Sequence, residues 1–191
     1  MNIAQIITAF GLAGAAGLNA YIPLLLVAVA GRLGVISLAA PFDILTSWPA
    51  IIALGVLLVI EMVVDKVPGA DHVNDVVQTF VRPAAGAVLF AANVGVIQGM
   101  DPTVGLIAGL VMALTVHGAK ASARPVINVS TLGIGAPVIS VIEDVTSATA
   151  AFLALFAPLV FVVFVGVVVF VVLRLLRRIR RKAGRSEIQT A

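Results

Sequence analysis

The sequence predicts an all-helical protein that is held in a membrane by five or more hydrophobic segments. Hydrophobic residues make up 61% of the 191 residues and charged residues only 11%. Soluble domains contain about 45–50% apolar and about 25% charged residues, so a soluble fold of this size could not hide so much apolar surface. The apolar runs are long and unbroken rather than alternating, which favours helices over the strands of a membrane barrel.

Four segments match the length of a membrane-crossing helix, which is about 20 residues with a range of about 17–25. The first begins with Trp48, a typical residue at the membrane interface. The tight turn Asp101-Pro102 joins the second segment to the third. The four predicted segments are 48–64, 83–100, 104–120 and 148–173.

Two further apolar stretches are interrupted by glycine and proline. Residues 3–33 are too long for one crossing and too short for two, and their middle, 14–23, contains two glycines and Pro23. We interpret this stretch either as one broken helix or as two short helices that form a hairpin. Residues 126–142 are interrupted in a similar way between Gly133 and Pro137, and are too short and too broken for a comfortable crossing.

The two interrupted stretches share a local pattern. Residues 18–25 read LNAYIPLL and residues 132–139 read LGIGAPVI, with the prolines in register. If both stretches re-enter the membrane, the extra helix between them would place the two halves in opposite orientations. The sequence therefore suggests an inverted repeat with broken helices, a plan that recurs in transporters.

The charge distribution divides the chain into a helical membrane domain, 1–173, and a basic tail, 174–191. The tail holds seven basic residues and one acid, while the rest of the chain has a net charge of −3. Basic flanks are typical of the cytoplasmic side, so we expect a multi-pass protein of the cytoplasmic (inner) membrane with its C-terminus in the cytoplasm. We expect the lipid bilayer as a partner, with the tail near anionic headgroups, and no nucleic acid. The absence of cysteine excludes disulfides and thiolate metal sites, and no cofactor is expected.

Charged residues beside or within the apolar segments are the candidate functional residues, because such charges are costly in lipid. Glu61 and Asp65 are four residues apart and share a helix face. Residues 71–82 carry a polar stripe opposite a stripe of valines and Phe80, which predicts a short helix at the interface or along a water-filled cavity. A further acidic pair, Glu143-Asp144, follows the second interrupted stretch.

We predict that most of these charges form one polar layer at the mouth of the bundle. The full candidate set is Asn19, Glu61, Asp65, Lys66, Asp71, Asp75, Arg82, His117, Lys120 and Arg124. Two interpretations stay open, because such groups either form a site or simply pair to hold a helix in place. His117 is likewise either a proton relay or a hydrogen-bonded structural residue.

Two strings in this chain are similar to the signatures of a widespread bacterial family of small multi-pass membrane proteins that carries a domain-of-unknown-function label. The first string is Glu61-x-x-x-Asp65-Lys66-x-Pro68-Gly69-x-Asp71-x-x-x-Asp75, followed by Arg82-Pro83-x-x-Gly86. The second is His117-x-x-Lys120-x-x-x-Arg124 with Asn128-x-Ser130. The resemblance covers roughly residues 11–150 and excludes the basic tail. It implies a compact helical membrane domain and no particular activity.

These features favour a transporter or channel for a small anion or a lipid headgroup. Arg82, Lys120 and Arg124 would attract the anionic group, and Glu61 or Asp65 would carry a coupling proton or cation. One alternative is a structural or assembly protein without a small-molecule ligand. The other, less favoured, is an intramembrane enzyme acting on a lipid phosphate through Mg²⁺ on its aspartates. A homo-oligomer is a further expectation, although we expect Gly105-x-x-x-Gly109 to pack first within the monomer.

Overall fold

The computed structural model describes residues 3–65, 70–94, 101–130 and 135–189, and this part of the chain is all-α without strands. The predicted helical class is therefore confirmed. The elements are α1 (Ile3–Leu18), α2 (Tyr21–Arg32), the short 3₁₀ helix η1 (Phe42–Thr46), α3 (Trp48–Val64), α4 (Ala70–Val94), α5 (Pro102–Ser130), α6 (Gly135–Phe156) and α7 (Pro158–Gln189).

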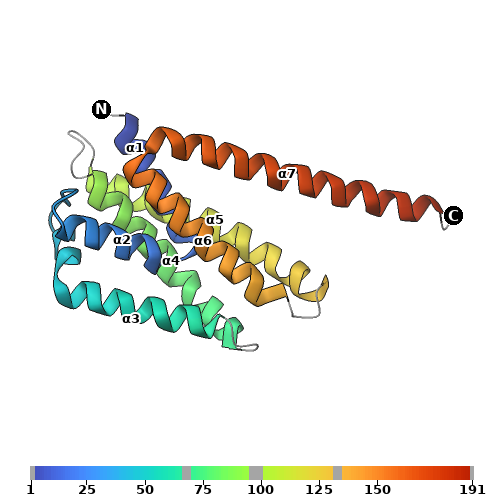
Figure 1. The fold of residues 1–191 in the computed structure, drawn as a ribbon, viewed down its shortest axis with the longest axis horizontal. Helices are drawn as coiled ribbons and strands as arrows, with labels where there is room; N and C mark the ends of the chain where they lie inside the picture. The colour runs from blue at the N-terminus through green and yellow to red at the C-terminus, as the bar shows by residue number, and fades with distance from the viewer. Residues whose placement is uncertain (1–2, 66–69, 95–100, 131–134, 190–191) are drawn as a thin grey trace.

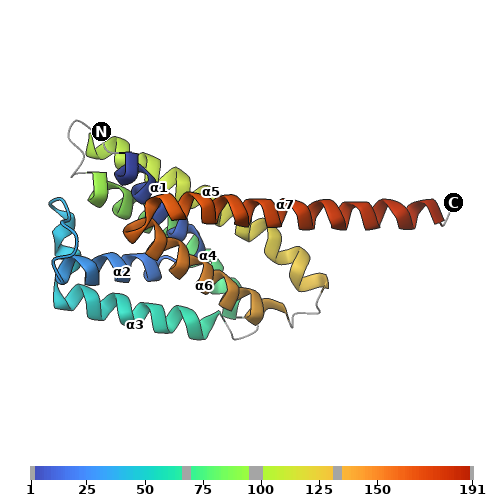
Figure 2. The same ribbon diagram turned by 45° about the horizontal axis from the view of Figure 1, so that its top comes forward.

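Successive helices run in alternating directions along the long axis of the molecule (Figure 1). The first helix, α1, is the centre of the bundle, since it packs against α4, α5, α6 and α7. The second helix, α2, packs against α3 and α6. The last helix, α7, lies on α6 and α1 near its start and then projects far beyond the bundle (Figure 2).

The predicted interruption of residues 3–33 is confirmed. Helix α1 ends at Leu18, and α2 begins at Tyr21 and returns toward the end of the bundle from which α1 came (Figures 1 and 2). Asn19 and Ala20, between the two helices, are almost fully buried. The hairpin interpretation is thus the correct one, and the bend lies inside the bundle.

Local sequence explains where several helices begin. The Ser47 side chain accepts a hydrogen bond from the Ala50 amide at 3.4 Å, and proline follows in the first turn of α3. Asp101 accepts a bond from the Thr103 amide at 2.7 Å at the start of α5. Hydrogen bonding from the backbone and the side chain of Thr103 lowers the pKa of the exposed Asp101 carboxyl.

Three predicted segment boundaries are wrong. Residues 148–173 do not form one helix, because the chain reverses between α6 and α7 at Pro158, which lacks an amide hydrogen and suits the first turn of a new helix. Residues 71–82 are not a separate interfacial helix, since α4 continues through Pro83. Residues 126–142 are interrupted as predicted, but their two parts belong to long helices, since α5 ends at Ser130 and α6 begins at Gly135.

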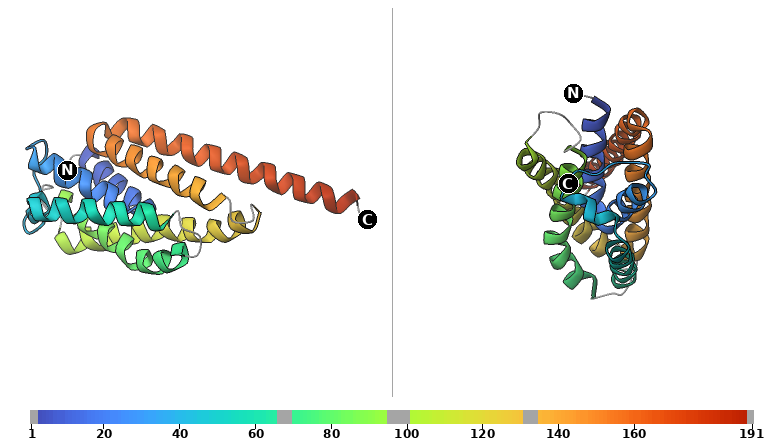
Figure 3. Two further views of the ribbon diagram at one scale, coloured as in Figure 1. Left: turned by 60° about the horizontal axis from the view of Figure 1, so that its bottom comes forward. Right: turned by 90° about the vertical axis from the view of Figure 1, so that its left-hand side faces the viewer.

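The helix directions also correct the inverted repeat. Helices α1, α2 and α3 run in the same three directions as α5, α6 and α7, with α4 between the two sets (Figures 1 and 3). Prolines do occupy the third position of both α2 and α6, at Pro23 and Pro137. Any relation between the two halves is therefore parallel, because each interrupted stretch is followed by a full reversal.

Glycines allow the central helices to approach closely. A Cβ on Gly17 would lie 2.6 Å from the Ala113 carbonyl oxygen, and one on Gly86 would lie 2.8 Å from that of Gly109. A Cβ on Gly109 would in turn clash with the backbone of Gly86. Gly109 thus packs within the chain, as expected, and joins α4 to α5.

The outer surface of the bundle is apolar. Large hydrophobic side chains are exposed along α3, α5, α6 and α7, including Phe170, which is 61% exposed. Two described helical stretches, Pro102–Ala123 and Pro137–Phe156, are long and apolar enough to cross a membrane. Four other apolar stretches are shorter: Ile3–Leu18, Tyr21–Arg32, Trp48–Val64 and Pro158–Arg174.

Candidate functional site: a buried polar cluster at the break between α1 and α2

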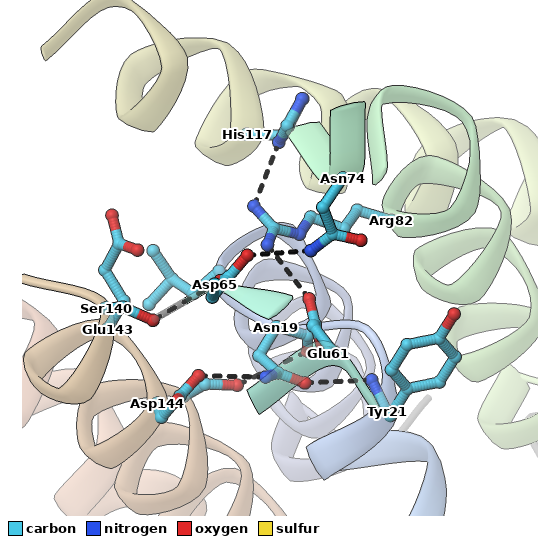
Figure 4. Close-up of polar contacts among 12 residues, drawn as sticks. Asn19, Tyr21, Glu61, Asp65, Asn74, Arg82, His117, Ser140, Glu143 and Asp144 are labelled. Atoms are coloured by element: carbon cyan, nitrogen blue, oxygen red, sulfur yellow. Dashed lines mark hydrogen bonds and ion pairs between the residues drawn. The ribbon is translucent and has the colours of Figure 1, made fainter. Parts of the chain in front are cut away.

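Polar side chains from α3, α4, α5 and α6 meet around the break between α1 and α2 (Figure 4). We call this group the polar cluster. Each of its core members is at most 8% exposed. These members are Asn19, Glu61, Asp65, Gln78, Arg82, His117, Lys120, Ser140 and Asp144.

Arg82 is the most buried charge of the polar cluster. Its side chain is 0% exposed, and its Nη2 lies 3.0 Å from Oε1 of Glu61, whose side chain is 1% exposed. Its Nη1 lies 3.3 Å from Nδ1 of His117 (Figure 4). A buried charge needs a partner and further hydrogen bonds to offset the loss of its hydration, and Arg82 obtains them from α3 and α5.

The neighbours of His117 fix its protonation. Arginine can only donate, so His117 Nδ1 must accept the hydrogen bond from Arg82. The Nε2 atom, 3.1 Å from the Thr79 hydroxyl, therefore carries the imidazole hydrogen. A hydrogen on Nδ1 would oppose the guanidinium, so the Arg82 contact favours the neutral imidazole.

Asp65 joins three helices. Its Oδ1 accepts a hydrogen bond from Asn74 Nδ2 of α4 at 2.7 Å. Its Oδ2 accepts one from the Ser140 hydroxyl of α6 at 3.3 Å. Asp65 lies directly after α3, where its amide bonds to the Glu61 carbonyl at 2.9 Å. The end of α3 is thereby tied to both α4 and α6.

Asn19 connects the helix break to α6. Its Oδ1 accepts hydrogen bonds from the amides of Tyr21 at 3.0 Å and Ile22 at 3.1 Å, so it caps the first turn of α2. Its Nδ2 donates to Asp144 Oδ1 at 2.9 Å (Figure 4). One amide side chain therefore bridges the start of a helix and a buried carboxylate.

Lys120 contacts the end of α1, on the other side of the break from α2. Its Nζ lies 2.7 Å from Glu143 Oε2 and donates to the Leu18 carbonyl oxygen at 3.1 Å. Leu18 is the last residue of α1, and a cation beside a helix C-terminus is favourable because that end carries partial negative charge. Lys120 thus satisfies a carbonyl that the break would otherwise leave unpaired.

Acids outnumber cations among the cluster side chains that the structure describes. The described acids are Glu61, Asp65, Glu143 and Asp144, and the ion pairs join Glu61 to Arg82 and Glu143 to Lys120. Four buried side-chain atoms have no hydrogen-bond partner: Glu61 Oε2, Gln78 Oε1, Arg82 Nε and Asp144 Oδ2. Unsatisfied buried polar atoms are few in native proteins, and each requires an explanation.

Six of the ten predicted residues meet in the polar cluster: Asn19, Glu61, Asp65, Arg82, His117 and Lys120. Lys66 lies outside the described residues, and for Asp71, Asp75 and Arg124 the structure describes the helix but not the side chain. The described members are buried, and they lie where α1, α3 and α5 end and α2, α4 and α6 begin. No group of three metal-ligating side chains occurs among the described residues.

Sequence reasoning left Asp144 out of the site, although it recorded the Glu143-Asp144 pair. The available signal was a carboxylate pair between apolar residues of one helix, 135–156, where charges are costly. Gln78 was visible as the neighbour of Arg82 on the polar stripe of α4. Asn74 and Ser140 had no sequence signal, because single small polar residues are common in helices.

The model of a protein family described as a domain of unknown function (DUF4126) matches residues 6–178. The chain belongs to this family. No curated protein and no solved structure matches the chain.

Proposed function

We propose that this family member is a multi-pass membrane protein, with its C-terminus in the cytoplasm, that acts as a proton-coupled transporter. The observation that carries the proposal is the polar cluster itself. Charged side chains from α3, α4, α5 and α6 meet at a helix break inside an apolar bundle. Ionisable residues at such depth are rare, and they mark ion pathways and proton relays more often than surface charges do.

The orientation of α4 supports a lipid environment. Its polar stripe turns inward, with Gln78 1% and Arg82 0% exposed, while Val76, Val77 and Phe80 are 65%, 51% and 75% exposed. In a soluble bundle the apolar face is buried. The reverse arrangement is favourable where the exterior is lipid, so α4 fits a membrane rather than a surface helix.

The contacts of the described charges favour a proton or cation over the small anion or lipid headgroup expected from the sequence. Arg82 already contacts Glu61, and Lys120 already contacts Glu143. An anion would have to displace these carboxylates at the cost of leaving them buried and unpaired. The bare oxygens of Glu61 and Asp144 instead offer places for positive charge.

The test is solute-driven proton flux in liposomes that contain the full chain and an enclosed pH-sensitive dye. The solutes are Na⁺, K⁺, Li⁺, phosphate and short carboxylates. We expect one solute gradient to move protons, and Glu61→Gln to abolish that flux. The control is Asp43→Asn, because Asp43 is an exposed carboxylate in η1, outside the polar cluster.

A second variant, Arg124→Ala, tests the alternative of an anionic substrate. Arg124→Ala is expected to leave a cation-driven flux intact and to abolish one driven by phosphate or carboxylates. Proton flux that responds to no solute, or that persists in Glu61→Gln, would contradict the proposal and favour a structural or assembly role.

A further inference from the structure

Asp144 is the least compensated carboxylate among those of the polar cluster with described contacts. Glu61 and Glu143 each face a cation, at 3.0 Å and 2.7 Å. Asp144 Oδ1 accepts only from the neutral amide of Asn19, and its Oδ2 has no hydrogen-bond partner although the residue is 8% exposed. A bare anionic oxygen is costly away from water, and adding a proton removes that charge.

Charges of both signs surround Asp144. Asp65, directly after α3, and Glu143 of α6 are acids, and the cation Lys120 of α5 contacts Glu143 at 2.7 Å. His117 of α5 contacts Arg82, and α1 carries no titratable side chain. On α2 the titratable groups are Tyr21 and Arg32, the latter in the last turn, and α7 is apolar up to Arg174.

The contacts of Asn19 connect this carboxylate to the fold. Its carbonyl oxygen accepts from the first two amides of α2, while its Nδ2 donates to Asp144. A hydrogen bond to a carboxylate is roughly twice as strong as one to a neutral group. Neutralising Asp144 would therefore weaken the bond that fixes the Asn19 side chain against α6.

We infer that Asp144 is the proton-binding site of this protein and that Asn19 transmits its protonation to the first turn of α2. The inference rests on the proposed function, in which a proton is the coupling species. One proton adds to the Asp144 carboxylate to give the neutral acid, and the same proton leaves in the return step. The helix break is the element that responds, because α1 and α2 are joined there only by Asn19 and Ala20.

Infrared difference spectroscopy of the full chain in lipid tests whether Asp144 binds the proton. We expect the carbonyl band of a protonated, buried carboxylic acid that disappears as pH rises. The band should be absent in Asp144→Asn and retained in Asp43→Asn. Isotope labelling of aspartate carboxyls in the unsubstituted chain should shift the band, and Asp65→Asn should retain it.

A band that survives in Asp144→Asn, or that shifts with labelled glutamate instead, would overturn the assignment. If Asp144→Asn does not fold, the labelled chain decides between aspartate and glutamate, and Asp65→Asn then separates the two aspartates that the structure describes as buried. No band at any pH, with stabilisation by Na⁺ or Li⁺ instead, would also overturn it in favour of a cation site.

Hydrogen exchange tests whether Asn19 transmits the protonation of Asp144 to the first turn of α2. The Tyr21 and Ile22 amides should exchange faster at low pH, after correction for intrinsic rates, and equally fast at all pH values in Asp144→Asn. Trp48, the single tryptophan, lies 5.1 Å from the Arg32 guanidinium at the other end of α2 and gives a second, fluorescent signal. Exchange that does not depend on pH would overturn the transmission through Asn19.

The flux assay and the spectroscopy fail independently. An Asp144 band together with no solute-driven flux would leave the proton site standing and contradict the transport proposal. A flux that Glu61→Gln abolishes, together with no Asp144 band, would support the transport proposal and overturn the proton site at Asp144.

Discussion

The body of α1 and its C-terminal end lie in different chemical environments. The body packs closely against neighbouring helices, as at Gly11, where an added Cβ would lie 2.5 Å from Ala154 Cβ. The end lies in the polar cluster, where the carbonyl oxygen of Leu18 accepts a hydrogen bond from a buried lysine. Close packing fixes the helices at one separation, whereas charges and hydrogen bonds can exchange partners when a proton is added. The same helix therefore joins a closely packed region to the polar cluster, whose contacts can change.

The largest expected effect comes from a substitution in the polar cluster, at Arg82 of α4. Arg82→Leu leaves Glu61 buried without a cation and should lower the free energy of unfolding by about 3–5 kcal/mol. Chemical unfolding in detergent measures it. Glu61→Leu combined with Arg82→Leu should recover most of the loss, and a double variant as unstable as the single one would contradict the pairing.

Lys120→Gln should cost roughly 1.5–3 kcal/mol, because it removes charged hydrogen bonds to Glu143 and to the Leu18 carbonyl. A double-mutant cycle with Glu143→Gln separates the two contacts, since only the first involves Glu143. Strict additivity in the cycle would show that the Lys120–Glu143 pair contributes nothing to stability.

The close packing of the central helices is tested by a matched pair of substitutions on α5. Gly109→Ala should destabilise by about 1–3 kcal/mol, because the new Cβ meets the backbone of Gly86. Gly118→Ala meets nothing within 4 Å and should stabilise the helix by up to about 1 kcal/mol. Thermal unfolding of the two variants should move in opposite directions, and equal shifts would refute the close contact.

The smallest loss of stability is expected at Asn19, between α1 and α2. Asn19→Ala removes the cap of α2 and should cost about 0.5–2 kcal/mol. Asn19→Ser keeps a capping oxygen and should recover part of that cost. Unfolding measurements on both variants decide whether the capping contact or the link to Asp144 dominates.

The candidate site was only partly predictable. Glu61, Arg82 and His117 stood out because charge in an apolar segment is rare, and the structure brings them together. The predicted helix boundary at Pro83 was wrong, because α4 continues through it. The same type of residue does end a helix at Pro158, so proline alone could not locate the boundaries.

Composition and hydrophobic runs by themselves determined the helical class, the interruption between Leu18 and Tyr21 and the identity of the costly charges. These features follow from local chemistry, because apolar length, glycine and proline act on their own segment. The tertiary structure alone decided that Asp144 meets Asn19, 125 residues away in the sequence, and that its second oxygen has no partner. Such a pairing depends on which helix faces pack together, and one sequence does not encode it in any local pattern.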